Sequence, residues 1–190
     1  MPDSIRRRPP LDGFDLETGS PRVGLANPGP ATRFLLRGGE AVAARAGPVL
    51  GLTIPQEACR AAVQANRAAL WLGPDEWLLL APEAEGRDIA ERLLPALDGL
   101  PHALTDIGHG GAGLVVAGPA AAELLNAGCP LDLHESAFPV GMCTRTLLGK
   151  AEIVLWRTAP ETFRIEAGRS FANYVRAFLL EAVRGLTVGS

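Results

Sequence analysis

Short apolar segments alternate with glycine- and proline-containing turns along most of the chain. Those with the length and composition of β-strands lie at 34–36, 68–72, 77–80, 104–107, 114–117, 143–148, 151–156 and 162–166. The segments 68–72 and 77–80 are apolar at every position, whereas a strand with one face in water alternates apolar and polar residues. We therefore expect both faces of this pair of strands to be covered.

Helical spacing of apolar residues predicts helices at 40–46, 87–97 and 120–127, and a C-terminal helix after Ser170. We expect Gly47 and Pro48 to end the first helix, and the Ser170 side chain to cap the N-terminus of the last one. From Phe171 to Val183, apolar residues recur at i, i+3, i+4 and i+7 and form one continuous face.

The order of these elements repeats along the chain. The strand from Phe34 to Gly38 and the strand from Leu114 to Gly118 are each followed by a helix, an apolar hairpin and a second helix. The repeated order is strand, helix, strand, strand, helix, which predicts an α+β fold built from two related halves. We place an extended N-terminal arm at 1–30, the first half at 31–100 and the second half at 101–190.

The proposed arm, residues 1–30, is rich in proline and has no periodic pattern. This composition fits either a disordered tail or a segment that becomes ordered against a partner. Apolar residues spaced through it, among them Phe14 and Leu16, favour the second interpretation. We expect these two side chains to contact a partner.

The composition is that of an ordinary globular protein, with 47% hydrophobic residues, 21% charged residues and a net charge of −3. A nucleic-acid-binding protein would more often be basic, and no apolar stretch approaches the roughly 20 residues of a membrane span. Three cysteines without a CxxC pair fit a reducing compartment. Arg6, Arg7 and Arg8 are not followed by an apolar run, so we expect no export signal and a cytoplasmic location.

Patterns that usually mark a catalytic or ligand site are missing or incomplete. No serine lies in a G-x-S-x-G elbow, and the spacing of Cys129, His134 and Cys143 fits no common zinc pattern. The glycine-rich segment 108–113 lacks the Gly-Lys-Ser/Thr ending of a phosphate-binding loop, and a turn with positive φ would explain its glycines. We expect no catalytic, cofactor-binding or metal site on this chain.

Trp71 and Trp77 flank the turn of the apolar hairpin. Each ring could belong to the core or to a partner surface, where aromatic anchors are favoured. Arg145 and Lys150 are candidates for polar contacts with a partner, although solvated strand ends explain them equally well.

Two segments resemble sarcosine oxidase gamma subunits. The first is the hairpin from Leu70 to Leu80, and the second runs from Asn126 to Val175 through Arg145-Thr146-Leu147-Leu148-Gly149-Lys150-Ala151-Glu152. The resemblance covers roughly residues 30–185. Ala167 and Gly168 depart from it, because bulkier apolar residues are expected there.

This resemblance implies an aminomethyltransferase-like fold and a non-catalytic gamma subunit of a heterotetramer that oxidises sarcosine to glycine. FAD, FMN, NAD and tetrahydrofolate would then be bound by the alpha, beta and delta partner subunits, and none by this chain. The alternative is a stand-alone folate-binding protein of the aminomethyltransferase type. Those proteins carry a Lys-Gly-Cys-aromatic-x-Gly-Gln/Glu motif, and the comparable segment 141–145 lacks the lysine, the aromatic residue and the second glycine.

Overall fold

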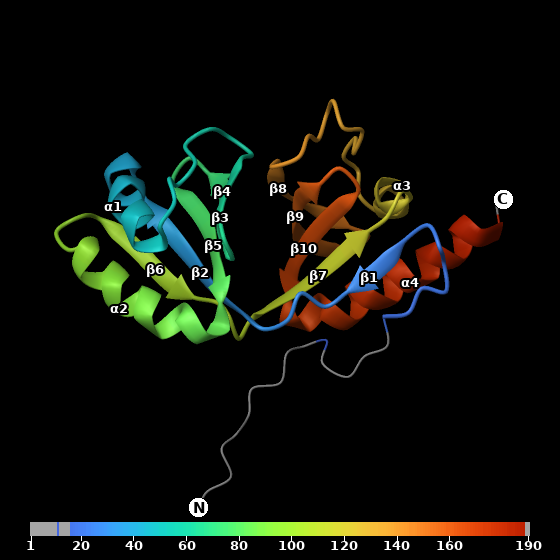
Figure 1. The fold of residues 1–190 in the computed structure, drawn as a ribbon, viewed down its shortest axis with the longest axis horizontal. Helices are drawn as coiled ribbons and strands as arrows, with labels where there is room; N and C mark the ends of the chain where they lie inside the picture. Colours follow the sequence, from blue (N-terminus) through green and yellow to red (C-terminus); the bar gives the residue numbers. More distant parts are fainter. Residues whose placement is uncertain (1–10, 12–15, 189–190) are drawn as a thin grey trace, which may run out of the picture.

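Two five-stranded antiparallel sheets form the centre of the computed structural model, which describes residues 11 and 16–188 (Figure 1). The first sheet has the order β3-β4-β5-β2-β6 and the second β1-β7-β10-β9-β8. The strands are β1 Gly24–Ala26, β2 Ala31–Gly38, β3 Ala61–Gln64, β4 Arg67–Gly73, β5 Glu76–Pro82, β6 His102–Asp106, β7 Gly111–Ala117, β8 Cys143–Leu148, β9 Ala151–Ala159 and β10 Thr162–Gly168. The helices are α1 Glu40–Leu50, α2 Gly86–Ala96, α3 Ala121–Asn126 and α4 Ala172–Val188.

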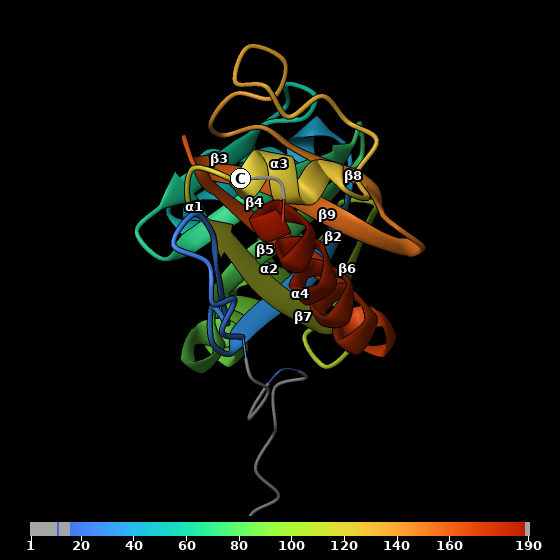
Figure 2. The same cartoon turned by 90° about the vertical axis from the view of Figure 1, so that its right-hand side faces the viewer.

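The sheets and helices are stacked in four layers. Helices α1 and α2 cover the outer face of the first sheet, and α3 and α4 cover the outer face of the second (Figures 1 and 2). The inner faces of the two sheets meet in a separate apolar cluster that includes Leu70, Leu78 and Leu80 from one sheet and Cys143 and Trp156 from the other. Every central strand is therefore covered on both sides.

The structural repeats begin at β1 and at β6, and each gives its first strand to the sheet of the other, so β1 belongs to the first repeat although it lies within the proposed arm. Strand β1 pairs with β7 at the edge of the second sheet, and β6 pairs with β2 at the edge of the first. Apart from this exchange, the two halves have the same order of elements, including a 3-10 turn before the last helix of each. The chain therefore crosses between the sheets twice, at 27–30 and 107–110.

The outer core of the first half contains Trp77. On β5, Trp77, Leu79 and Ala81 face the helices, while Leu78 and Leu80 face the second sheet. Trp77 is fully buried, and its indole N–H donates a hydrogen bond of 2.7 Å to the Pro55 carbonyl. The prediction that both faces of this hairpin are covered is thus confirmed.

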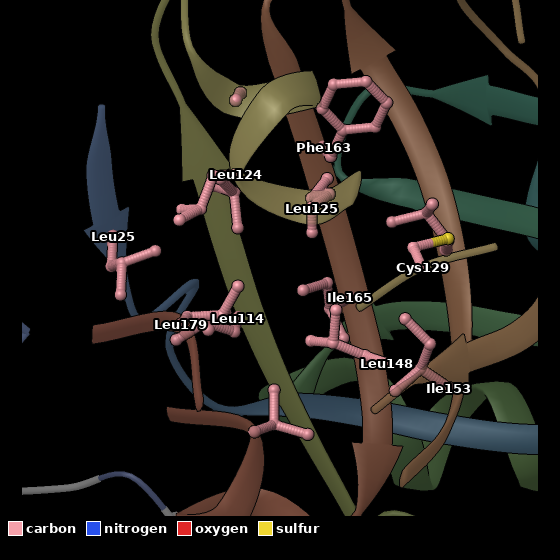
Figure 3. Packing of buried hydrophobic residues seen from close by; sticks show 14 of the residues in the cluster. Leu25, Leu114, Leu124, Leu125, Cys129, Leu148, Ile153, Phe163, Ile165 and Leu179 are labelled. Carbon is pink, nitrogen blue, oxygen red and sulfur yellow. The ribbon is translucent and has the colours of Figure 1, made fainter. Parts of the chain in front are cut away.

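The corresponding core of the second half is shown in Figure 3. Side chains from the second sheet and from the two helices beside it point toward one another there. The labelled members are Leu25, Leu114, Leu124, Leu125, Cys129, Leu148, Ile153, Phe163, Ile165 and Leu179. Leu25 belongs to β1, so the exchanged strand contributes to this core.

Two predicted helix boundaries are wrong. Helix α1 continues through Gly47 and Pro48 to Leu50, because Gly51, at φ +72°, donates its N–H to the Pro48 carbonyl and closes the helix there. The C-terminal helix begins at Ala172, and Ser170 lies inside the preceding 3-10 turn instead of capping α4. Strands β1 and β3 were not predicted, since each has at most four residues.

An ion pair between Arg145 and Glu76 joins the two halves. Arg145 on β8 donates two hydrogen bonds to the Glu76 carboxylate on β5, at 2.6 and 3.1 Å. The hydrogen bonds from Arg145 hold the pKa of Glu76 below its ordinary value of 4.5, and the same carboxylate raises the pKa of Arg145. This bidentate contact fixes one end of the interface between the sheets.

We expect Trp77→Ala to lower the free energy of unfolding by about 3–5 kcal/mol, because it empties a fully buried site. Urea unfolding followed by far-UV circular dichroism measures this change. Trp71→Ala is the matched control, and its loss should be clearly smaller because the Trp71 ring is only half-buried. Equal losses in the two variants would contradict the placement of Trp77 in the core.

We expect Glu76→Gln to lower stability by about 1 kcal/mol at neutral pH. A carboxylate whose pKa is lowered by folding contributes stability above its ordinary pKa, and this contribution disappears as the pH falls through the lowered value. The difference between wild type and variant should therefore vanish in acid. Urea titrations at neutral and acidic pH test this, with Glu91→Gln as the control because the Glu91–Arg87 pair is exposed. A stability difference between wild type and Glu76→Gln that persists in acid would contradict the stabilising role of the ionised Glu76 carboxylate.

Candidate functional site

A buried cluster of three charged side chains lies between the two sheets. The Nε of Arg33 on β2 donates to Glu166 Oε2 on β10 at 2.6 Å, and Arg164 Nε donates to Glu166 Oε1 at 2.7 Å. Arg33 and Glu166 each have only 6% of their side-chain surface exposed, and Arg164 has 19%. A second bond from Arg33, to the Ala31 carbonyl at 3.0 Å, holds the guanidinium in place.

Gly111 and Gly113 on β7 make room for this cluster. A Cβ atom at Gly111 would lie 2.5 Å from Arg33 Cδ, and one at Gly113 would lie 2.8 Å from Pro28 Cγ and 3.0 Å from the Arg33 guanidinium. Neither glycine has a positive φ. Our explanation of these two glycines by turn geometry is therefore wrong, and the close approach of Arg33 from the other sheet explains them instead.

The cluster carries an excess of positive charge, because two guanidinium groups share one carboxylate. Buried charges are tolerated when each is paired and its donors are satisfied. Arg164 Nη2 lies 2.7 Å from Glu166 Oε1, the oxygen that also accepts from Nε, so this edge of the guanidinium is ion-paired with Glu166. The Nε1–H of Trp156 is buried without a partner among the described residues.

Arg164 and Trp156 face each other across β10 and β9, and both line a cavity of about 390 Å³. The cavity lies beside the first crossing of the chain between the sheets and beside the end of β5. Its walls are formed by Pro28, Pro30, Ala31, Val63, Ala65, Asn66, Arg67, Ala68, Leu80, Ala81, Pro82, Trp156 and Arg164. Two arginines and no acidic residue are therefore part of its wall.

A second cavity, of about 370 Å³, occupies the corresponding place in the other half. It adjoins the second crossing, near Ile107 and Gly110, and the end of β10. Leu78 lines it at the position that corresponds to Arg164 in the repeat. The repeat thus places two cavities at equivalent positions, and only the first has Arg164 and Trp156 in its wall.

The side chains proposed for partner contact lie in different environments. Trp77 is fully buried, so its ring is enclosed by this chain, and Trp71 is half-buried against the same core. Leu16 packs partly against the core of the second half, and Phe14 lies outside the described residues. Leu16 and Trp71 therefore pack against different cores.

The two basic residues proposed for partner contact also differ. Arg145 binds Glu76 within the chain, as described above. Lys150 is exposed in the turn between β8 and β9, where its backbone N–H donates to the Tyr174 hydroxyl at 3.0 Å. Both residues are exposed, and Arg145 is in addition held by its ion pair with Glu76.

The buried Cys143 thiol is not activated. Burial raises the pKa of the Cys143 thiol to about 12, so almost none of it is thiolate at neutral pH. In the described ranges no group of three or more His, Cys, Asp or Glu side chains is placed to hold a metal ion. Nor is any described helix long and apolar enough to cross a membrane.

Sequence reasoning missed Arg33, Arg164, Glu166 and Trp156. A signal was available in β10, where Arg164 and Glu166 alternate with Phe163 and Ile165. Such alternation is typical of a strand with one solvated face. It does not reveal that the polar face meets an arginine of another sheet.

Comparisons with known sequences agree on one family. The model of the sarcosine oxidase, gamma subunit family matches residues 37–184. A sarcosine oxidase subunit gamma from Arthrobacter sp. is 36% identical over 135 residues, which are 70% of this chain and 66% of that protein. One from Corynebacterium sp. (strain P-1) is 38% identical over 61% of this chain and 56% of its own length. The chain thus spans two thirds or less of the curated relatives it matches.

Comparisons with solved structures agree on the fold. A heterotetrameric sarcosine oxidase from Corynebacterium sp. U-96, in complex with pyrrole 2-carboxylate, contains a chain that matches with a TM-score of 0.86 and 29% identity, over 94% of this chain and 95% of that one. Aminomethyltransferase T from Bartonella henselae matches with a TM-score of 0.65 and 14% identity, over 84% of this chain and 45% of that one. The second likeness concerns the fold alone, and it confirms the expected aminomethyltransferase-like architecture.

The family match extends over most of the chain and reaches into both halves; it includes Arg164 and Glu166 but begins after Arg33. The resemblance inferred from the hairpin and from the C-terminal half is therefore confirmed. The chain belongs to the sarcosine oxidase gamma subunit family.

Proposed function

We propose that this chain is a non-catalytic gamma subunit that supports the assembly of a heterotetrameric sarcosine oxidase. The complex would oxidatively demethylate sarcosine to glycine in the cytoplasm, together with alpha, beta and delta subunits. FAD, FMN, NAD and tetrahydrofolate would be bound by those partners. The observation that carries the proposal is the likeness of nearly the whole chain to one chain of a solved heterotetramer.

The chemistry of the chain supports a structural role. Buried Arg33 and Glu166 are bound to each other across the sheets, and the Cys143 thiol is protonated at neutral pH. The alternative, a stand-alone folate-binding protein, has the aminomethyltransferase-like fold in its favour. At 14% identity, that likeness does not extend to function.

The turn between β8 and β9 is the partner surface that we propose first. Strand β8 is the last strand of its sheet, and Leu147, with 48% of its surface exposed, lies near the exposed Lys150. Edge strands with exposed apolar side chains readily pair with other chains. Leu16 and the half-buried Trp71 remain additional proposed contacts.

The proposal is tested by co-expressing a tagged copy of the chain with the neighbouring open reading frames. Affinity purification should yield a yellow complex that contains larger flavoprotein chains, identified by mass spectrometry and by the visible spectrum. The chain expressed alone should be colourless. A chain that purifies without larger partners and binds flavin or folate stoichiometrically would overturn the proposal in favour of the alternative.

The proposed surface is tested in the same system. We expect Leu147→Asp to reduce recovery of the partner chains, because a charge at an apolar contact must be desolvated when the partner binds. Leu94→Asp is the matched control, since Leu94 is an exposed leucine on α2 in the other half. Equal recovery with both variants would show that the β8–β9 turn is not a contact.

A further inference from the structure

We infer that Cys59 and Cys143 are a modification site at which a peroxide forms a disulfide between the two halves of the chain. This inference concerns the chain itself and does not depend on its assembly with other subunits.

The first argument is the place of the two cysteines, where the backbones of the two sheets meet. Arg60, directly before β3, and Met142, directly before β8, form an antiparallel bridge. Beside this bridge, the Cys143 N–H donates a hydrogen bond of 2.9 Å to the Cys59 carbonyl. Cys59 and Cys143 therefore lie opposite each other, one in each half.

The second argument is the separation that this pairing imposes. Opposite residues of an antiparallel pair have Cα atoms about 4.5–5.5 Å apart, and a disulfide requires about 4.4–6.8 Å. The Cys143 side chain lies in the apolar cluster between the sheets, and Ala61, two positions after Cys59, packs against the same cluster. Burial is the main cause of the raised pKa of Cys143, and the negative charge of the Cys59 thiolate adds to it. Such an effect of one charge on another requires that the two sulfurs lie near each other.

The backbone of Cys59 provides the third argument. Its φ is +60°, and among the described residues only Ala65 shares a positive φ without being glycine. A residue with a side chain is strained in this conformation, which glycine or asparagine adopts more readily. Such strain persists only where surrounding contacts hold the residue in place, and it is frequent at functional positions. The hydrogen bond from Cys143 is one such contact, so the two cysteines hold each other in register.

The two thiols differ in their access to solvent, which sets the order of the reaction. Cys59 is half-buried, whereas Cys143 is fully buried. Hydrogen peroxide therefore oxidises the Cys59 thiol first, to a sulfenic acid, and one water is released. The Cys143 sulfur then attacks the Cys59 sulfur, the S–S bond forms, and the hydroxyl leaves with the Cys143 proton as a second water. Two thiols thus lose two electrons, and one peroxide is reduced to two waters.

The raised pKa of Cys143 fits this assignment of roles. With little thiolate at neutral pH, the Cys143 thiol is a poor target for a peroxide in solution. In the second step it is held beside the sulfur that it attacks, and this proximity compensates for a low thiolate fraction. Cys129, the third cysteine, is buried in the outer core of the second half and has no part in the reaction.

The disulfide would join positions that lie eighty-four residues apart in the sequence. A link that closes so long a loop restricts the unfolded chain strongly, while the folded chain already holds the two residues opposite each other. We therefore expect oxidation to raise the Tm by about 5–10 °C, and a reducing agent to reverse the rise.

The test is exposure of the folded full chain to hydrogen peroxide, followed by non-reducing peptide mapping. Cleavage with trypsin and at Asp132 separates Cys129 from Cys143. Mass spectrometry should then find the Cys59 peptide joined to the Cys143 peptide, with the loss of two hydrogens. The count of free thiols should fall from three to one.

Variants separate the steps of the reaction. Cys59→Ser should remove both the linked peptide and the oxidative rise in Tm, whereas the matched control Cys129→Ser should keep both. In Cys143→Ala the reaction should stop at the Cys59 sulfenic acid, which dimedone traps as an adduct. Cys59 is only half-buried, so Cys59→Ser tests the inference even where substitution of Cys143 disturbs folding.

The inference is overturned by any of three results. These are oxidation of Cys59 to a sulfinic acid while Cys143 stays free, a linked peptide that forms only in urea, and an equal rise of Tm in Cys59→Ser. Because the measurement uses this chain alone, its failure would leave the proposal of a gamma subunit untouched.

Discussion

The buried contact between Arg33 and Glu166 ties together two strands that lie far apart in sequence, at a separation of 133 residues. It joins β2 of the first sheet to β10 of the second, at 2.6 Å and almost entirely shielded from water. Removing one partner of such a pair leaves an uncompensated buried charge, which typically costs about 3–5 kcal/mol. The pair therefore fixes the position of one sheet on the other. In that position there is no room for side chains at Gly111 and Gly113.

The exchange of edge strands adds a second constraint of the same kind. Because β1 completes the second sheet and β6 completes the first, neither half can build its full sheet alone. Leu70 and Leu80 of the first sheet and Trp156 of the second then bury their side chains between the sheets. A duplicated α+β unit has in this way become one folded body.

Much of the fold could be predicted from local patterns. The uninterrupted apolar hairpin around Trp77 indicated two covered faces, and the structure has a helix layer on one face and a sheet on the other. The duplication was visible in the order of strands and helices. Which strand completes which sheet could not be predicted, because β1 has only three residues and its partner lies about ninety positions away in the chain.

The candidate site shows the same limit. The glycines at 111 and 113 were visible in the sequence, but their cause is an arginine nearly eighty positions earlier. Arg164 and Glu166 follow the alternation of a half-solvated strand, and only the approach of the other sheet buries them. Local sequence shows the periodicity of a strand or helix. It does not show which other part of the chain will pack against it.

Differential scanning calorimetry of the full chain tests most directly whether the two halves are one body. We expect a single transition in which the calorimetric and van't Hoff enthalpies agree, because exchanged strands and a buried ion pair prevent one half from unfolding without the other. Two resolved transitions, or a calorimetric enthalpy well above the van't Hoff value, would contradict this account.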